Sequence, residues 1–533
     1  DDGVRPVLTP RCPGVDLTSI AFSHTAIFKT LSRLKSNSAG GPDGIPPSFL
    51  KNARSQLATP LAFLYQLFHD STFVPAVWLK AHVTPVFKKG DSSSTSNYRP
   101  ISLTCSLCKV MESTIKDQVM AFLSSRNLLS KEQHAFIAKH STVTNLLECV
   151  HDWSLSLHNK VPQDVLYFDF SHAFDSVVSQ KLLIKLQSFG IGGTLLAWIG
   201  AFFEGRSQCV VVEHMLSNWV KVVSGVPQGS VLGPLLFILY IDDIVLIYPG
   251  EISFKLFADD LKLYSSVQPS AVSSELHIVL PLLENWCHIW QLQVNISKTY
   301  VMHLGPNNPR LAYAFDNISI KSTESIRDLG VEVDAALKFD LHISDVVKKA
   351  FCRVGTLFRG FSTREPNILL KAYKTYIRPI FDYASNVWSP YHLKYINAIE
   401  RVQRNFTKRI PSLCNLSYAE RLAMLDLETL ECRRLKADLI MYYKIINNLT
   451  SFNASAYFEF DIHARDTRLA AESNSYCINK PFCRTFGFQN EFFQRCISCW
   501  NSLPNTVVES SSTKLFKCEL DNINLSHFLK YKL

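Results

Sequence analysis

Apolar and polar residues alternate through residues 252–267, on both sides of two adjacent acids, Asp259 and Asp260. A period of two is typical of half-buried strands, and its interruption at the acids indicates a tight turn. The segment therefore predicts a strand, a turn and a second strand, with both carboxylates at the tip. A short apolar run at residues 164–168 ends at a third acid, Asp169, and predicts a buried strand that carries a carboxylate at its end.

Other stretches repeat their apolar residues at helical spacing. Residues 177–190 predict a helix closed by Gly190, and residues 366–380 predict another. A further helix is indicated by the apolar positions of residues 399–410. The other faces of that helix carry the basic side chains Arg401, Arg404, Lys408 and Arg409. A helix of this kind either contacts a phosphate backbone or faces water.

The three acids carry the candidate chemistry. Asp259 and Asp260 repel each other when charged, so a cation or strong hydrogen-bond donors are needed beside them. Carboxylate oxygens suit magnesium, with manganese as an alternative. If the strands lie side by side, Asp169 joins the pair, and such a cluster can bind two metals roughly 3.5–4 Å apart for phosphoryl transfer. The alternatives are an ordinary Asp-containing turn and, for Asp169, a helix cap or a solvated strand end.

Two loops contribute further candidates. Residues 224–234 are rich in glycine and proline, which permits close backbone approach to a ligand, and Gln228 offers both a donor and an acceptor. Residues 86–91 predict a strand that enters a turn, and the hairpin carries basic groups suited to phosphate. These groups are Lys88, Lys89 and Arg99. The alternatives are an ordinary glycine-rich loop and a solvated charged turn.

Two features are expected to be structural. Asp242 and Asp243 form a second acidic pair inside an apolar stretch, and we expect them to cap a helix end or to face solvent. The fourteen cysteines favour free buried thiols over a disulfide framework. CxxC pairs occur at residues 105–108 and 496–499, with two more cysteines upstream of the second pair. Because this spacing is irregular, we favour core thiols over a zinc site.

Composition narrows the class of protein. A chain of 533 residues is long enough for several domains with large cores. A hydrophobic content of 47% and an aromatic content of 12% exclude wholesale disorder. The formal net charge of +9 suits a polyanionic partner without identifying one. Pro234, Asp242 and Asp243 interrupt the apolar residues 231–248, which argues against a membrane span.

Several ordered motifs resemble those of a known family. The central ones are FDFSHAFD at residues 168–175, SGVPQGS at 224–230 and FADD at 257–260. Others flank them: GPDGI at 41–45, NYRPISL at 97–103, NISKT at 295–299, LGV at 329–331, IRP at 377–379 and WNSLP at 500–504. In this order and spacing they resemble the reverse transcriptase of non-LTR retrotransposons, most of all the jockey and chicken-repeat types. The resemblance covers nearly the whole chain and implies an RNA-directed DNA polymerase.

The resemblance implies a role for the acids. Asp169 and Asp259 would bind two magnesium ions, with Asp260 as a supporting ligand. Lys298 would lie near the leaving pyrophosphate as a cation or proton donor. The primer 3′-hydroxyl would then attack the α-phosphate of a deoxynucleotide in line.

The resemblance also implies a nucleotide pocket. Arg99, with Lys88 or Lys89 beside it, would hold the triphosphate. Phe174 would sit under the sugar and reject a 2′-hydroxyl by its bulk. The remaining residues implied in this pocket are Phe170, Gln228, Gly229 and Ala258.

Three positions depart from the family pattern. Ala135 and His140 stand where the family usually has Gly and Arg, and His172 stands where Lys is more usual. Ala lacks the conformational freedom of Gly, and His is mostly neutral at pH 7 where Arg is charged. These changes weaken the expectation of template contacts near residue 140. None of them touches the three acids, so we expect a competent active site.

The fold implied by the resemblance is an α+β right hand of fingers, palm and thumb. Its antiparallel palm sheet would be backed by helices, and a mostly helical region would follow. The expected divisions are an N-terminal extension (1–60), fingers (61–160), palm (161–310, in a polymerase core of roughly 80–335), thumb and connection (311–450), and a C-terminal module of unknown role (451–533).

The resemblance implies partners as well. We expect the chain to act with an RNA template, a nicked chromosomal DNA target as primer, deoxynucleoside triphosphates and an element RNA-binding protein. We expect no association with a membrane. The family's endonuclease is expected upstream of this chain. Synthesis would take place in the nucleus, with a cytoplasmic ribonucleoprotein stage. The alternatives are a catalytically silent RNA-binding remnant of a retroelement and a group II intron maturase-like protein.

Overall fold

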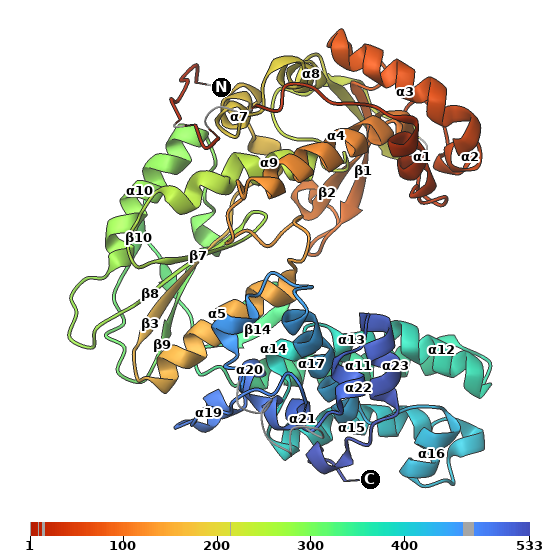
Figure 1. Ribbon diagram of the computed structural model, residues 1–533, viewed down its shortest axis with the longest axis vertical. Coiled ribbons are helices and arrows are strands. Elements are labelled where there is room, and N and C mark those ends of the chain that lie inside the picture. Colours follow the sequence, from red (N-terminus) through yellow and green to blue (C-terminus); the bar gives the residue numbers. More distant parts are fainter. Residues whose placement is uncertain (1, 9, 13–15, 214, 462–473, 533) are drawn as a thin grey trace.

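The computed structural model describes residues 2–532 except 9, 13–15, 214 and 462–473. Figure 1 shows two groups of elements, with α1–α4 and α7–α10 in one and α11–α23 in the other. Two clusters of buried apolar side chains correspond to these groups. We call the cluster that contains Leu31, Trp198 and Leu239 the first core, and the cluster that contains Trp153, Trp388 and Trp500 the second core.

A five-stranded sheet lies between the two cores, in the strand order β12–β9–β3–β8–β7. Its strands are β3 (Gln163–Phe168), β7 (Ser253–Phe257), β8 (Asp260–Ser266), β9 (Tyr300–Leu304) and β12 (Lys321–Ser322). All neighbours are antiparallel except β12 and β9. Because successive side chains of a strand point to opposite faces, Leu166 and Phe168 enter the first core while Val165 and Tyr167 enter the second. The expected antiparallel palm sheet is confirmed.

On the side of this sheet that faces the first core, α10 (Glu275–Trp290) packs against β8, and the small hairpin of β10 (Ala314–Phe315) and β11 (Ile318–Ser319) includes a strand that contacts α10. The first core also contains α6 (Ala173–Ser176) and α7 (Ser179–Ser188), with α8 (Gly193–Phe203) and α9 (Gly233–Ile241) packed against α7. The helix predicted within residues 177–190 is α7. Its chain reverses at Gly190, whose φ of 79° is left-handed and suits glycine.

A second sheet extends the first core toward the N-terminal helices. Strand β1 (Lys80–Phe87) pairs antiparallel with β2 (Tyr98–Leu103) and parallel with β4 (Ser207–Val212). Two short strands, β5 (Met215–Leu216) and β6 (Val220–Lys221), pair with β4. The adjoining helices are α1 (His24–Ser32), α2 (Pro47–Asn52), α3 (Arg54–Asp70) and α4 (Ser106–Ser125). Residues before 60 also contribute to the first core, through Ile20, Leu31 and Leu50.

The second core is almost entirely helical. It begins with α5 (Thr142–His158) and the hairpin of β13 (Ser325–Asp328) and β14 (Val331–Asp334). The helices that follow are α11 (Asp340–Gly360), α12 (Pro366–Tyr376), α13 (Pro379–Asp382), α14 (Ser385–Trp388), α15 (Leu393–Lys408), α16 (Tyr418–Met424) and α17 (Leu430–Ile446). The last are α18 (Ala454–Tyr457), α19 (Phe486–Gln489), α20 (Phe492–Arg495), α21 (Ile497–Asn501), α22 (Asn505–Val508) and α23 (Thr513–Asp521). The described residues after 451 therefore pack into the same core as the helices before them.

Two of the predicted helices differ in outcome. The helix predicted over residues 366–380 is wrong in length, because α12 ends at Tyr376 and α13 starts at Pro379, whose ring lacks the N–H that a continuous helix needs. Ile399, Val402 and Phe406 do lie on one helix, α15, but this helix ends at Lys408 with Arg409 as its C-cap, so Ile410 follows it. Its basic groups pack beside aromatic rings, with Arg401 over Phe351 and Arg409 over Phe358.

Asp242 and Asp243 are structural and lie at a helix end as expected, since Asp242 is the C-cap of α9, but the alternative of solvent exposure is wrong for Asp242. Asp242 is fully buried, forms an ion pair with Arg11 and accepts a hydrogen bond from the backbone N–H of Ser130 at 3.0 Å. Asp243 forms an ion pair with buried Lys185. The pair therefore fixes distant segments to the end of α9, because buried carboxylates need such partners.

Within the described part of the chain, no helix is both long and apolar enough to cross a membrane. The cysteines of the two CxxC pairs are buried free thiols: Cys105, Cys108, Cys496 and Cys499.

Candidate active site

The β7–β8 hairpin presents two of the three acids. Phe257 pairs with Asp260, so Ala258 and Asp259 form the two-residue turn between the strands. Ala258 has a left-handed φ of 57°, a conformation that costs an L-residue energy and needs support from its surroundings. The predicted strand, turn and strand are confirmed.

The neighbouring strand delivers the third acid. In the pairing of β3 with β8, Phe168 lies opposite Leu261, and Asp169 follows directly after Phe168. Continuing this antiparallel register places Asp169 beside Asp260. The buried strand predicted to end in a carboxylate is therefore confirmed, and residues almost a hundred positions apart meet at one end of the sheet.

Electrostatics reflect this crowding. Burial and the charge of Asp169 raise the pKa of Asp259, while the positive charges of Arg99 and Lys298 partly oppose the rise. Burial of the carboxyl group and the charges of Asp259 and Asp328 raise the pKa of Asp260 to about 7, although the residue keeps an exposed surface. Concentrated negative charge of this kind favours a bound cation.

Lys298 lies at the same end of the sheet. Its Nζ is 2.9 Å from Asp169 Oδ2, and both side chains are partly open to solvent. The segment before it is tied to the end of β3, because Asn295 donates its backbone N–H to the Asp169 carbonyl at 2.7 Å and Ser171 donates to Gln293 at 2.8 Å. The structure thus brings Lys298 to the acids, as its position in the sequence motif predicts.

The glycine-rich loop packs between the two sheets. Ser102 of β2 donates its backbone N–H to the Gln228 carbonyl at 2.7 Å. A Cβ at Gly229 would lie 2.3 Å from the Ser102 carbonyl oxygen, and the φ of 130° is also left-handed, so only glycine fits. Gln228 Nε2 donates to Asp175 at 2.9 Å. The loop is therefore fixed on β2, on one side, and on the turn that follows β3, on the other.

The aromatic candidates differ in exposure. Phe174 is half-buried and stacks on Phe237 of α9, with ring centroids 4.2 Å apart. Phe170 lies in the first core and Ala258 is also buried, so these two offer a nucleotide mainly their backbone.

The basic hairpin is open to solvent. Lys88, Lys89 and Arg99 are exposed, and no ion pair in the described part of the chain engages them. The Lys88 N–H donates to the Asn97 carbonyl at 2.8 Å, which closes the loop between β1 and β2. Arg99 lies near enough to Asp259 to stabilise its charged form. Free basic groups on a hairpin beside the acids are suited to binding phosphate.

The match to known proteins fits this geometry. Residues 86–333 match the family described as reverse transcriptase (RNA-dependent DNA polymerase). This chain contains a reverse transcriptase domain. The resemblance inferred from the motifs is thereby confirmed, and the three acids, Gln228 and Lys298 all lie inside the matched segment.

Three relatives show the same relationship over a longer stretch. The chain is 26% identical over 400 residues to the "Probable RNA-directed DNA polymerase from transposon X-element" of Drosophila melanogaster, covering 72% of this chain and 44% of the relative. It is 24% identical over 402 residues to the RNA-directed DNA polymerase from mobile element jockey of the same species, covering 73% and 44%. It is 25% identical over 406 residues to the Pol polyprotein from retrotransposable element R1 of Bradysia coprophila, covering 73% and 38%. The chain spans less than half the length of these relatives.

The reverse transcriptase family depends on divalent metal ions. Among the described residues, no three His, Cys, Asp or Glu side chains converge closely enough to form a ready metal site. The carboxylate of Asp169 is instead turned toward Lys298. The donor set still fits a hard divalent cation, because three carboxylates at one strand end raise each other's affinity for positive charge, as the pKa shifts of Asp259 and Asp260 show.

The sequence did not reveal every residue beside this site. The reverse transcriptase domain holds Gln133 fully buried against the turn of the acids, where its Oε1 accepts the Ala258 N–H at 3.0 Å. Asp328, in a buried ion pair with Lys262 at 2.8 Å, adds to the charge around Asp260. Only the pairing of residues 132–134 with β7 brings Gln133 to the turn, and no local pattern indicates that pairing.

Proposed function

We propose that this chain is the RNA-directed DNA polymerase of a non-LTR retrotransposon. The observation that carries the proposal is the register of β3 and β8, which sets Asp169 beside Asp259 and Asp260 within a reverse transcriptase domain. Copying the element's own RNA onto a nicked DNA target, in the nucleus, is the use that fits relatives from mobile elements.

Asp169, Asp259 and Asp260 would hold two magnesium ions, with manganese as the alternative. When bound, the metal ions supply charge neutralisation for the attacking and leaving oxygens of phosphoryl transfer. The chain's own part is to fix the carboxylates: the strand pairing sets their spacing, and the turn at Ala258 orients Asp259. Lys298 balances the negative charge of Asp169 until substrate arrives.

The surrounding groups would bind the incoming deoxynucleotide. Arg99 and the exposed Lys88 and Lys89 are placed to hold a triphosphate. Phe174, held by its stack on Phe237, is placed to limit the space at the sugar. The Gln228–Gly229 backbone, fixed on β2, completes the pocket on the template side.

The test compares deoxynucleotide incorporation on a primed RNA template, with magnesium, by the full chain and by Asp259→Ala. We expect incorporation to fall at least about 100-fold in the variant, because a metal ligand at the reacting phosphate is lost. Asp117→Ala is the matched control, since Asp117 is an exposed acid on α4 that pairs with Arg33 at the surface. Retained synthesis by Asp259→Ala would refute the assignment of the site. Folded wild-type protein without incorporation would refute the proposed activity for this chain.

A further inference from the structure

We propose that Gln133 is a positioning residue for the turn that carries the acids, acting through the backbone N–H of Ala258. The inference rests on the proposed function for its catalytic consequence, but its structural part does not. Gln133 is fully buried, and its Oε1 accepts two backbone N–H groups, from Ala258 at 3.0 Å and from Ala135 at 2.9 Å. Gln133 therefore contacts a residue 125 positions away in the sequence, Ala258, which directly precedes Asp259.

The turn needs this external acceptor. The last cross-strand pair of the hairpin is Phe257 with Asp260, so the Ala258 N–H has no partner in the ladder of β7 and β8. Ala258 is buried, and a buried N–H without an acceptor is costly. The residue also holds a left-handed φ, next to two acids whose charges repel. Local sequence alone does not favour this conformation, so the contact from Gln133 stabilises it.

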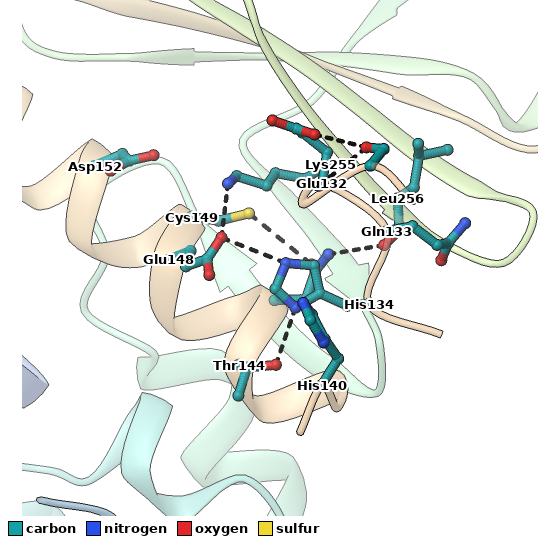
Figure 2. A network of polar contacts seen from close by, with 12 residues as sticks. Glu132, Gln133, His134, His140, Thr144, Glu148, Cys149, Asp152, Lys255 and Leu256 are labelled. Atoms are coloured by element: carbon teal, nitrogen blue, oxygen red, sulfur yellow. Dashed lines mark hydrogen bonds and ion pairs between the residues drawn. The ribbon is translucent and has the colours of Figure 1, made fainter. Parts of the chain in front are cut away.

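Gln133 is itself held rigidly by its backbone. Leu256 donates its N–H to the Glu132 carbonyl at 2.9 Å, and His134 donates its N–H to the Leu256 carbonyl at 2.9 Å. The segment 132–134 thus lies along β7 as a short parallel bridge. Figure 2 shows this segment beside Leu256, with the labelled residues of α5 to its left.

The side chain of His134 connects the same segment, residues 132–134, to α5. Its Nδ1 lies 2.9 Å from the hydroxyl of Thr144, and its Nε2 lies 3.3 Å from Glu148. Glu148 in turn binds Lys255 of β7 at 2.7 Å. These contacts, drawn in Figure 2, join the first turns of α5 to the strand that leads into the acids. The helix and the strand therefore hold Gln133 from both sides.

The oxygen of Gln133 carries the contact, and its amide nitrogen does not. Nε2 has no hydrogen-bond partner among the described residues. Gln133→Glu, protonated because burial disfavours the charged carboxylate, keeps an acceptor at the same length, whereas Gln133→Met keeps the length and volume but has no such acceptor. The two variants therefore separate loss of the hydrogen bond from loss of packing. Gln118→Met is the matched control, because Gln118 also bonds to a distant backbone, at Ala21, far from the acids.

Two measurements test the inference. The first is hydrogen exchange of the Ala258 amide in metal-free protein, which needs no activity. We expect exchange at Ala258 at least about tenfold faster in Gln133→Met, and within about threefold of wild type in Gln133→Glu and Gln118→Met. In Gln133→Met the increase should be larger at Ala258 than at amides far from the turn, which separates local opening of the turn from the lower global stability that the lost acceptor also causes. Unchanged exchange at Ala258 in Gln133→Met would overturn the inference.

The second measurement is steady-state incorporation on primed RNA. In Gln133→Met we expect kcat to fall roughly 10–100-fold, with KM for the deoxynucleotide within about threefold, because small displacements of catalytic groups slow chemistry more than binding. Gln133→Glu should keep most of the wild-type kcat. A wild-type chain that is inactive but shows the expected exchange would refute the proposed function alone. An active wild type with equal kcat in Gln133→Met would refute the positioning role alone.

Discussion

At the scale of single residues, the candidate site depends on positions where only one type of residue fits. Gly229 is the clearest, because its backbone meets the Ser102 carbonyl of β2 so closely that no Cβ can be placed between them. This contact joins the loop at Gln228 to the strand that carries Arg99. Glycine at this position therefore allows the close approach between the nucleotide pocket and the basic hairpin.

Gly229→Ala is expected to lower the free energy of unfolding by about 1–3 kcal/mol or more, since it combines a clash with a strained left-handed φ. Incorporation on primed RNA should fall with it, because the loop must move away from β2. Chemical denaturation and activity assays on the same samples measure both effects. Gly487→Ala, in α19 with no atom near its Cβ position, is the control and should change neither. A Gly229→Ala protein as stable as wild type would contradict this account.

At the scale of elements, the sequence predicts what its local pattern encodes. The alternation around Asp259 is a property of neighbouring residues, and the β7–β8 hairpin follows from it. The buried pairing of Asp242 with Arg11 is not predictable in this way, because 231 positions separate the two residues. The contact between Gln133 and Ala258 is not predictable for the same reason, because 125 positions separate these residues. Motif order identifies the acids, whereas the groups that position them depend on tertiary contacts between distant segments.

His342 of α11 lies where this helix packs against β14, and its protonation makes the stability of this junction depend on pH. Burial lowers the pKa of His342 from 6.5 to about 4, and the positive charges of Arg327 and Lys349 act in the same direction, against Asp345. Its Nδ1 accepts the Glu332 N–H at 3.2 Å, and its ring packs against Trp388. The folded protein therefore holds this ring neutral, whereas the unfolded chain protonates it below pH 6.5.

The sign of the resulting pH dependence follows from the two pKa values. The unfolded state binds the extra proton between pH 6.5 and 4, so the stability contributed by neutral His342 is lost as pH falls through that window, by about 3 kcal/mol in all. In His342→Asn, whose Oδ1 can replace the acceptor, this loss should be absent. Urea denaturation at a series of pH values measures it, with His288→Asn, an exposed histidine, as control. Parallel stability profiles for wild type and His342→Asn would show that the ring does not titrate in this way.

At the scale of the whole molecule, the palm sheet has a core on each face, and both cores must be in place for the acids to be held. The second core joins α5 and the sheet to the helices up to α23 and to Leu525 beyond them, so the C-terminal segment is part of the support of the site. One buried ion pair connects a C-terminal helix, α20, to α17 within the second core. Asp438 of α17 binds Arg495 of α20 at 2.8 Å and accepts a hydrogen bond from Asn386 at 2.9 Å.

Asp438→Asn should therefore destabilise the whole second core. It leaves the Arg495 charge buried without its counter-charge, which typically costs about 3–5 kcal/mol. Native-state hydrogen exchange of the amides of α17, α20 and α5 measures the loss, and all three should exchange faster together because they share one core. Asp345→Asn, which breaks an exposed pair with Lys349, should cost under about 0.5 kcal/mol at neutral pH. In the double variant with Arg495→Met, part of the stability should return, since no unpaired charge remains. Faster exchange confined to α20 would show instead that the C-terminal helices are only attached to the second core and do not support the site.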